Sequence, residues 1–508
     1  MKAKMFIILF FVTTAGMPAM PDWYDADLAG QYPGYFVGKG FSEIKAGKPA
    51  EAALKAKEEA LKDAASVIFS RVSGETINRT TETGIGAGSG VEDFFLSETQ
   101  VRTDLEVMGY KVLKNESDRN YAYALVGIPA SDMKNAFRKK IETAMAEIKN
   151  SFKLAEALTD QNPQKAIENY KACISQSKQL EEDLKIYLFL NNWHNDFDSE
   201  INTLPSTSSA ETKLTRLSGT TPKPTSALVQ EIVQPFLAGK GQERSFVFYP
   251  LQYENTGFVS SFGRNFSEIS ANRIAEDNRW YPLSFSQYDE ADFVFRGKIL
   301  QMDDGVLLSV RMESKNSNMN RSSEVFVNGI TCDRIGWDRI KPENLDQALR
   351  NKLALYKAIQ RDNTLKVELR TDKMSAGPVI YTYGEEPEIF VRTNKSCYIR
   401  LIYIFSDNTK TLIKNNYFIA TDQVNQWIRI PFDGVICEPS GVEQLILQAS
   451  TEKQPPVDYH RQNLGDGYFI DIITQEISKP VGVTRGLKLK NPAKEISEQV
   501  YQWTVFEK

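Results

Sequence analysis

Side chains able to support acid–base or metal chemistry are scarce in this sequence. Its 508 residues include two histidines, His194 and His460. Two histidines exclude a three-histidine zinc site and leave little material for a histidine general base. No G-x-S-x-G, H-E-x-x-H or caspase-type cysteine motif occurs. We therefore expect no catalytic residues and no metal ion, and we interpret the chain as a protein that is not an enzyme.

Acidic pairs and a glycine-rich run are the remaining candidates for a site. Asp303-Asp304 and Glu385-Glu386 fall in predicted turns, where solvated charge is the ordinary role of carboxylates. The run GIGAGSG at residues 84–90 has neither the dinucleotide-binding spacing nor the P-loop spacing. It predicts a surface loop, and we expect no cofactor.

The N-terminus has the pattern of a signal peptide over residues 1–19. Lys2 and Lys4 precede the apolar run MFIILFFV, and cleavage after Ala15 or Ala19 fits the small residues that follow. Eight apolar residues are too few for a membrane span, which needs about 20. No cysteine lies near either cleavage position, so we expect an exported protein that is not lipidated.

Composition and length limit the class of protein. Lysine and arginine total 61 residues against 66 aspartates and glutamates, a net charge of -5. Since binding to phosphate backbones draws on a surplus of basic residues, we expect no nucleic acid partner. At roughly 100 to 200 residues per domain, the length favours about three or four domains.

The four cysteines, Cys173, Cys332, Cys397 and Cys437, leave two interpretations open. In an oxidising compartment they can form disulfides in any of three connectivities. They can equally be small buried hydrophobic residues. No C-x-x-C pair occurs, which argues against a redox or zinc-ribbon site.

Hydrophobic periodicity divides the mature chain into successive modules. Residues 20–130 predict a small α/β domain, with a strand at 35–44, a helix from Pro49 to about Val72, and strands at 101–113 and 121–128 around a polar turn at 115–120. Residues 131–201 show two helical stripes, and Asn162-Pro163 predicts the start of the second helix. These two helices predict an αα-hairpin.

The second half of the chain predicts another α/β domain and a sandwich. Residues 202–226 are rich in serine, threonine and proline and predict a linker, interrupted by a short helix near 210–217. Residues 227–340 predict an α/β domain with a hairpin at 291–313, followed by a connecting helix at 341–363. Short strand patterns over 364–508 predict a β-sandwich, in which Arg400 must find a partner inside an apolar strand. The predicted fold class is multidomain α+β.

The first half of the chain carries features of known envelope modules. Pro21-Asp22-Trp23, Gly38-Lys39-Gly40 and the alanine-rich helix from Glu51 resemble the lipoprotein-20-like domain, which also occurs at the N-terminus of the flagellar T-ring assembly protein. The middle segments 247–250, 262–264 and 291–299 look like the α/β fold of curli-secretion, flagellar outer-membrane and penicillin-binding-protein activator lipoproteins.

The last part of the chain is similar to envelope modules known as domain of unknown function 4384. The segments that carry this resemblance are 383–385, 397–401, 415–417, 439–443 and 484–486. Cys397 and Cys437 both lie in this module, and we predict that they approach each other across the sandwich as a possible disulfide.

Together these resemblances imply a binding or assembly scaffold in the periplasm or at the outer membrane. They imply that its partners are envelope proteins or outer-membrane components, with peptidoglycan as a further candidate, and that its apparatus is related to the flagellum. The alternative is a carbohydrate- or peptidoglycan-binding protein or hydrolase that uses the C-terminal sandwich. Exposed aromatic rings beside carboxylates on one sandwich face would favour that alternative.

Aromatic residues are the candidates for an interface, because buried aromatic anchors carry much of the energy of protein association. Packing in the core is the other interpretation. The candidates lie near the start and in the middle of the chain, at Tyr32, Tyr35, Phe36, Tyr249, Tyr253, Trp280 and Tyr281.

Overall fold

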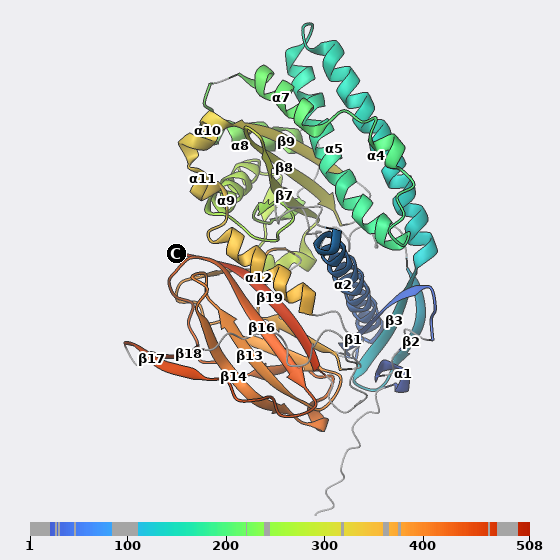
Figure 1. The fold of residues 1–508 in the computed structure, drawn as a ribbon, viewed down its shortest axis with the longest axis vertical. Helices are drawn as coiled ribbons and strands as arrows, with labels where there is room; N and C mark the ends of the chain where they lie inside the picture. Colours follow the sequence, from blue (N-terminus) through green and yellow to red (C-terminus); the bar gives the residue numbers. More distant parts are fainter. Residues whose placement is uncertain are drawn as a thin grey trace, which may run out of the picture. The chain divides into compact units, whose positions relative to one another are not determined.

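Figure 1 shows the fold in a computed structural model. It describes residues 21–25, 28, 31–44, 47–83, 110–219, 221–237, 244–315, 320–358, 365–373, 377–465, 468–474 and 496–507. The predicted signal peptide and the glycine-rich run at 84–90 lie outside these residues. The chain divides into two compact units. The first comprises described residues of Met1–Ile68 and Arg102–Asp132, and the second comprises described residues of Phe69–Val101 and Met133–Lys508.

The first unit is a three-stranded antiparallel sheet with a helix on one face. Its elements are α1 (Asp22–Asp25), β1 (Tyr35–Glu43), α2 (Pro49–Thr83), β2 (Lys111–Ser117) and β3 (Tyr121–Pro129), and the strand order is β1-β3-β2. Gly38 and Gly40 of β1 let the strand approach the backbone of α2 at Ala56, Ala60 and Ala64. The predicted strand at 35–44 and the start of the predicted helix at Pro49 are confirmed, but the helix continues past Val72 to Thr83. Residues 101–109 of the predicted strand at 101–113 lie outside the described residues, and β2 continues to Ser117, so the turn before β3 is shorter than predicted.

The predicted αα-hairpin is present in the second unit. It consists of α4 (Ala130–Leu158) and α5 (Pro163–Leu190). The Asn162 side chain caps α5 by accepting a hydrogen bond from the Lys165 backbone N–H. A short helix α6 (Asp198–Ile201) leads to α7 (Thr207–Ser218), whose Ala210 and Leu214 are buried. The predicted short helix in the serine- and threonine-rich stretch is therefore confirmed.

The middle of the second unit is a mixed sheet packed against helices. Its strands follow the order β6-β4-β7-β8-β9, parallel among β6, β4 and β7 and antiparallel from β7 to β9. The predicted hairpin is confirmed as β7 and β8. The elements are α8 (Thr225–Leu237), β4 (Arg244–Phe248), β5 (Gln252–Tyr253), α9 (Ser261–Ala275), β6 (Trp280–Pro282), η2 (Phe285–Glu290), β7 (Phe293–Met302), β8 (Gly305–Ser314), β9 (Asn320–Asn328), α10 (Gly329–Ile335), α11 (Trp337–Ile340) and α12 (Leu345–Ala358).

The C-terminal part is the predicted β-sandwich. A small sheet has the order β10-β12-β15, and a large sheet has the order β11-β19-β16-β13-β14-β18-β17. Arg400 donates hydrogen bonds to the Asn415 side chain and the Pro455 carbonyl, so its predicted need for a partner is met. The strands are β10 (Val367–Thr371), β11 (Ile380–Thr382), β12 (Ile389–Thr393), β13 (Cys397–Ile404), β14 (Lys410–Ile419), β15 (Ile428–Ile430), β16 (Gly441–Ser450), β17 (Tyr459–Gly465), β18 (Tyr468–Ile473) and β19 (Ile496–Phe506), with η3 (Thr421–Gln423) after β14.

Within the second unit, hydrogen bonds of the Asn344 side chain connect the α/β domain to the sandwich. The Asn344 amide donates to the carbonyl oxygens of Ser406 at 2.7 Å and Val442 at 2.9 Å, and its side-chain oxygen accepts from the Val442 N–H at 2.8 Å. The Val442 side chain is buried in the core of the α/β domain. We call Asn344 and Val442 the joint.

Candidate functional site

The aromatic candidates of the α/β domain are mostly core residues. Tyr249, Tyr253 and Trp280 are buried, and Trp280 packs edge-to-face against Phe293. Tyr281 is the exception, with 47% of its surface exposed. Packing in the core accounts for the three buried rings, so they do not indicate a binding surface.

In the first unit the aromatic candidates lie on both faces of the sheet. Phe36 is buried, and the alternation of β1 places it with Gly38 and Gly40 on the face that α2 covers. Tyr32 and Tyr35 are only half-buried. Tyr32 packs against a cluster of aromatic side chains on the opposite face.

We call this cluster the aromatic face. Neighbouring ring centroids lie 5.5 to 6.4 Å apart, within the usual range for interacting rings. Three of its rings, Trp23, Tyr24 and Tyr123, are buried, whereas Phe41 and Tyr121 are half-buried. The face consists of Trp23, Tyr24, Phe41, Tyr121 and Tyr123.

Lysines accompany these rings. Lys39 donates to the Tyr24 carbonyl oxygen at 2.6 Å, and the Lys114 ammonium lies 5.6 Å from the Trp23 ring centroid. The Trp23 indole N–H donates to the Glu116 carboxylate. The aromatic face therefore combines three buried rings and two half-buried rings with charged side chains beside them, and aromatic residues are enriched at protein interfaces.

A second aromatic surface lies on the sandwich, and none of its residues was a candidate from the sequence. The small sheet buries alternate residues of β10 and β12 and turns the others outward. The outward side chains include Arg370 and Phe390, which are cross-strand partners. The Arg370 guanidinium lies 5.4 Å from the Phe390 ring centroid and 4.1 Å from the Trp427 ring centroid.

Two further arginines complete this surface. The Arg392 guanidinium lies 4.9 Å from the Trp427 ring and pairs with Glu368, its cross-strand partner. Arg429 pairs with Glu388 at 2.9 Å. We call this surface the arginine patch; it comprises Glu368, Arg370, Glu388, Phe390, Arg392, Trp427 and Arg429.

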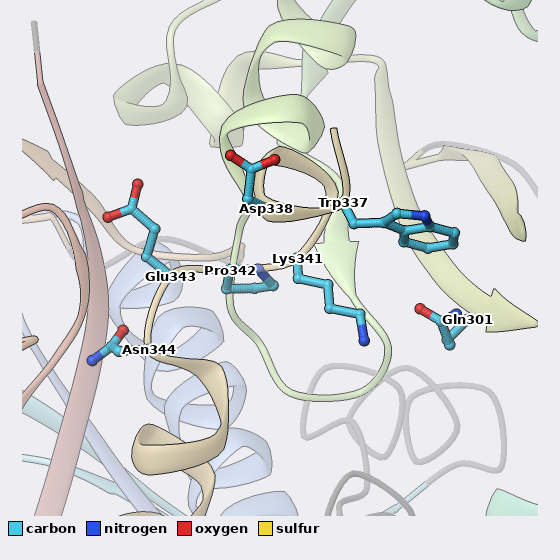
Figure 2. Close-up of a pocket in the computed structure, with 7 residues that line it drawn as sticks. All are labelled: Gln301, Trp337, Asp338, Lys341, Pro342, Glu343 and Asn344. Carbon is cyan, nitrogen blue, oxygen red and sulfur yellow. The ribbon is translucent and has the colours of Figure 1, made fainter. Parts of the chain in front are cut away.

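A cavity of about 560 Å³ opens beside the turn between α11 and α12. Figure 2 shows Trp337 and Gln301 at one end and Glu343 and Asn344 at the other, with Lys341 between them. The lining offers one lysine and two carboxylates but no serine, cysteine or histidine. The described lining therefore holds neither a serine–histidine nor a cysteine–histidine pair.

Glu443 is a buried carboxyl group inside the sandwich. It accepts a hydrogen bond from the Tyr403 hydroxyl, and the Tyr403 ring packs 5.4 Å from the Trp503 ring. Burial raises the pKa of Glu443 to about 8, although the hydrogen bond from Tyr403 acts in the opposite direction. This carboxyl group is therefore largely protonated at neutral pH.

The structure does not contain the predicted Cys397–Cys437 disulfide, because all four cysteines are free thiols. Cys397 is buried at the start of β13, whereas Cys437 is exposed and lies near Glu443. The strand register places Glu443 beyond the opposite end of β13. At about 3.3 Å per residue, the length of β13 separates Cys397 from Glu443, and so from the neighbouring Cys437, by more than about 20 Å. A disulfide requires Cα atoms within about 7 Å.

Both histidines lie outside any candidate site. His194 is 80% exposed and lies 3.4 Å from Asp196, and His460 is an exposed residue of β17. Within the described part of the chain, no group of three histidine, cysteine, aspartate or glutamate side chains could hold a metal ion. None of the helices described is both long and apolar enough to cross a membrane.

Comparisons with known proteins do not assign a family. No family model and no curated protein matches the chain. Among solved structures, it is similar to the secreted protein HP1454 from Helicobacter pylori, with 11% identity, coverage of 64% of this chain and 97% of that chain, and a TM-score of 0.20. It is also similar to TolB from Acinetobacter baumannii, with 10% identity, coverage of 46% and 71%, and a TM-score of 0.13. Both likenesses are too weak to indicate a function.

Proposed function

We propose that this protein is an exported, non-catalytic component of the bacterial cell envelope. In this proposal it acts as a binding or assembly scaffold for a periplasmic or outer-membrane apparatus, and the resemblance of its N-terminal domain suggests a flagellar one. The observation that carries the proposal is the aromatic face of the first unit, with its half-buried rings and its margin of lysines.

The aromatic face has the properties of a protein-binding surface. Half-buried Tyr32, Phe41 and Tyr121 can each lose further surface to a partner without leaving the sheet on which they are fixed. Aromatic rings contribute large contact areas at low cost in conformational entropy. Lys39 and Lys114 favour a partner with acidic groups around an apolar centre.

Site-specific photo-crosslinking in cells tests this proposal. A benzoylphenylalanine placed at Tyr32 or Tyr121 is expected to capture the same envelope protein, because both positions lie on one surface. The matched control position is Phe418, an aromatic residue of β14 in the sandwich that is 49% exposed. A second substitution, Phe41→Ala, should reduce capture from both positions.

The proposal fails if Tyr32 and Tyr121 capture nothing that Phe418 does not capture. It also fails if the protein is recovered only as a free cytosolic monomer, since export is part of the proposal. A change in the melting temperature of the Phe41→Ala variant identifies loss of folding as the reason for reduced capture.

A second candidate function is glycan binding by the sandwich, and the arginine patch favours it. Phe390 and Trp427, both half-buried, lie beside Glu368 and Glu388 on one face of the small sheet. Both carboxylates are held in ion pairs with arginines. This arrangement favours binding over hydrolysis, because glycoside hydrolysis needs one carboxyl group as acid and the other as base or nucleophile.

A further inference from the structure

The strand β2 lies at one edge of the three-stranded sheet of the first unit (Figure 1). Its residues Lys111–Ser117 pair with β3 on one side, and among the described residues no strand pairs with the other side. An edge strand of this kind directs alternate backbone N–H and C=O groups away from its neighbour. These groups can pair with an extended segment of another chain.

The outer edge of β2 is accessible. The strand contains no proline, and five of its seven residues are exposed. Its register shift falls near the start, between Val112 and Lys114, where the Leu113 side chain lies against Gly127 of β3. From Lys114 to Ser117 the pairing with β3 is regular, so the backbone groups at the outer edge follow the ordinary alternation of a strand.

Two lysines give this edge a positive charge. The Lys111 ammonium lies 3.4 Å from the Tyr35 hydroxyl oxygen and 5.7 Å from the centroid of that ring, and the Lys114 ammonium lies 5.6 Å from the Trp23 ring centroid. In the part of the chain that the structure describes, neither ammonium pairs with a carboxylate. The ring contacts therefore hold both charges beside the aromatic face without neutralising them.

These charges select the segment that the edge accepts. β2 contains two lysines and one glutamate, Glu116, which accepts a hydrogen bond from the Trp23 indole N–H. Opposite charges on neighbouring strands attract, whereas like charges repel. A second copy of β2 is therefore disfavoured as the added strand, and a segment with carboxylates opposite Lys111 and Lys114 is favoured.

The alternation of side chains specifies the rest of the segment. Lys111 pairs with Gly127 on the side of the aromatic face, whereas Val112 pairs with Val126 on the opposite side and is 44% exposed. Successive residues of an added strand alternate between the two sides in the same way. A segment of alternating acidic and β-branched residues therefore places carboxylates beside the lysines and an apolar side chain beside Val112.

We propose that the partner of this protein adds an extended acidic segment to β2 as a further strand of the sheet. This binding mode rests on the proposed function and gives the partner's segment a chemical class. Backbone hydrogen bonds along Lys114–Ser117 supply affinity, and the ammoniums of Lys111 and Lys114 supply selectivity for carboxylates.

Fluorescence anisotropy with the purified full chain and labelled model peptides tests the binding mode. A peptide of alternating glutamate and valine should bind at least about tenfold more tightly than a peptide of alternating lysine and valine. Two further versions of the acidic peptide carry N-methyl groups on all glutamates or on all valines. Because the N–H groups of alternate residues point to opposite edges of a strand, one methylated version should lose affinity by about tenfold or more, and the other should bind within about threefold of the parent.

Charge-reversal variants locate the site on β2. Lys111→Glu and Lys114→Glu should each weaken binding of the acidic peptide by about tenfold. The matched control is Lys55→Glu, which reverses an exposed lysine of α2 in the same unit and should retain binding within about twofold. Equal melting temperatures establish that all three variants fold.

Each contrary result overturns the binding mode. If the acidic peptide does not bind, or if the lysine peptide binds equally well, β2 does not select carboxylates. If both methylated versions keep the affinity of the parent, or if both lose it, the peptide does not pair with one strand edge. If the two β2 variants bind as wild type does, the site lies elsewhere. These results are distinct from failure of the proposed function, in which Tyr32 and Tyr121 capture no envelope protein in cells.

Discussion

At the scale of single residues, Glu443 couples folding of the sandwich to pH. Its pKa rises from the ordinary value of 4.5 to about 8 in the folded chain, chiefly because the carboxyl group is buried. Between these values the folded state binds a proton that the unfolded state releases, so the contribution of Glu443 to stability is greatest at low pH and declines as pH rises toward 8. Burial raises the pKa of four further carboxyl groups, which act in the same direction: Glu211, Glu254, Glu324 and Glu498.

Glu443→Gln should remove one component of this decline. Glutamine keeps an oxygen that accepts the Tyr403 hydrogen bond but carries no titrating proton. Between pH 5 and 8 the variant should therefore lose less stability than wild type, by up to about 1.4 kcal/mol per pH unit. Urea unfolding followed by tryptophan fluorescence measures this slope. A constant difference between the two proteins at every pH would contradict the prediction, and Glu268→Gln, on the surface of α9, serves as the control.

The thiols offer a second test at the residue scale. Cys437 is exposed, whereas Cys173, Cys332 and Cys397 are buried. A maleimide added to the folded protein should label Cys437 alone, and it should label all four cysteines after unfolding without a reductant. Recovery of a peptide that contains Cys397 linked to Cys437 would reinstate the disulfide that the sequence predicted.

At the scale of elements, the approach of β1 to α2 depends on two glycines. A Cβ atom on Gly38 would overlap the backbone of Ala60 and Ala64, and one on Gly40 would overlap the backbone of Ala56. Gly38→Ala should therefore separate the strand from the helix and reduce the stability of the first unit by about 2 kcal/mol or more. Thermal unfolding measures this loss. Val112→Ala, at an exposed position on β2, should change stability little, and an equal effect of both substitutions would contradict the explanation.

At the scale of the whole molecule, the joint should make the α/β domain and the sandwich unfold together. Asn344 provides three hydrogen bonds and has a backbone φ of 51°, so Asn344→Gly removes the side chain while permitting this conformation. Asn344→Asp keeps the acceptor but loses both donated bonds. Each variant should lose about 2 kcal/mol and broaden or split the calorimetric transition. A single unchanged transition in both variants would show that the joint does not couple the two parts.

Most of the helices and strands, and their types, could be predicted from the amino-acid sequence. Asn162 and Pro163 specified the start of α5, and alternating apolar residues specified β7 and β8, because capping and side-chain periodicity are local properties. The strand β19 was not predicted; its first seven residues are all half-buried, so the alternation of buried and exposed positions is lost there. Burial of Arg400 was anticipated from its apolar neighbours, but its partners, Asn415 and Pro455, were not.

The contacts between residues that are distant in the sequence could not be predicted in this way. Trp427 precedes a short strand and is far in sequence from Arg370, yet pairing of β10, β12 and β15 brings their side chains together. Likewise, the sequence placed Cys397 and Cys437 in one module, but the register of β13 and β16 separates them. Periodicity along a chain reports which face a residue occupies, whereas strand order and register, set by packing across the whole domain, determine its neighbours.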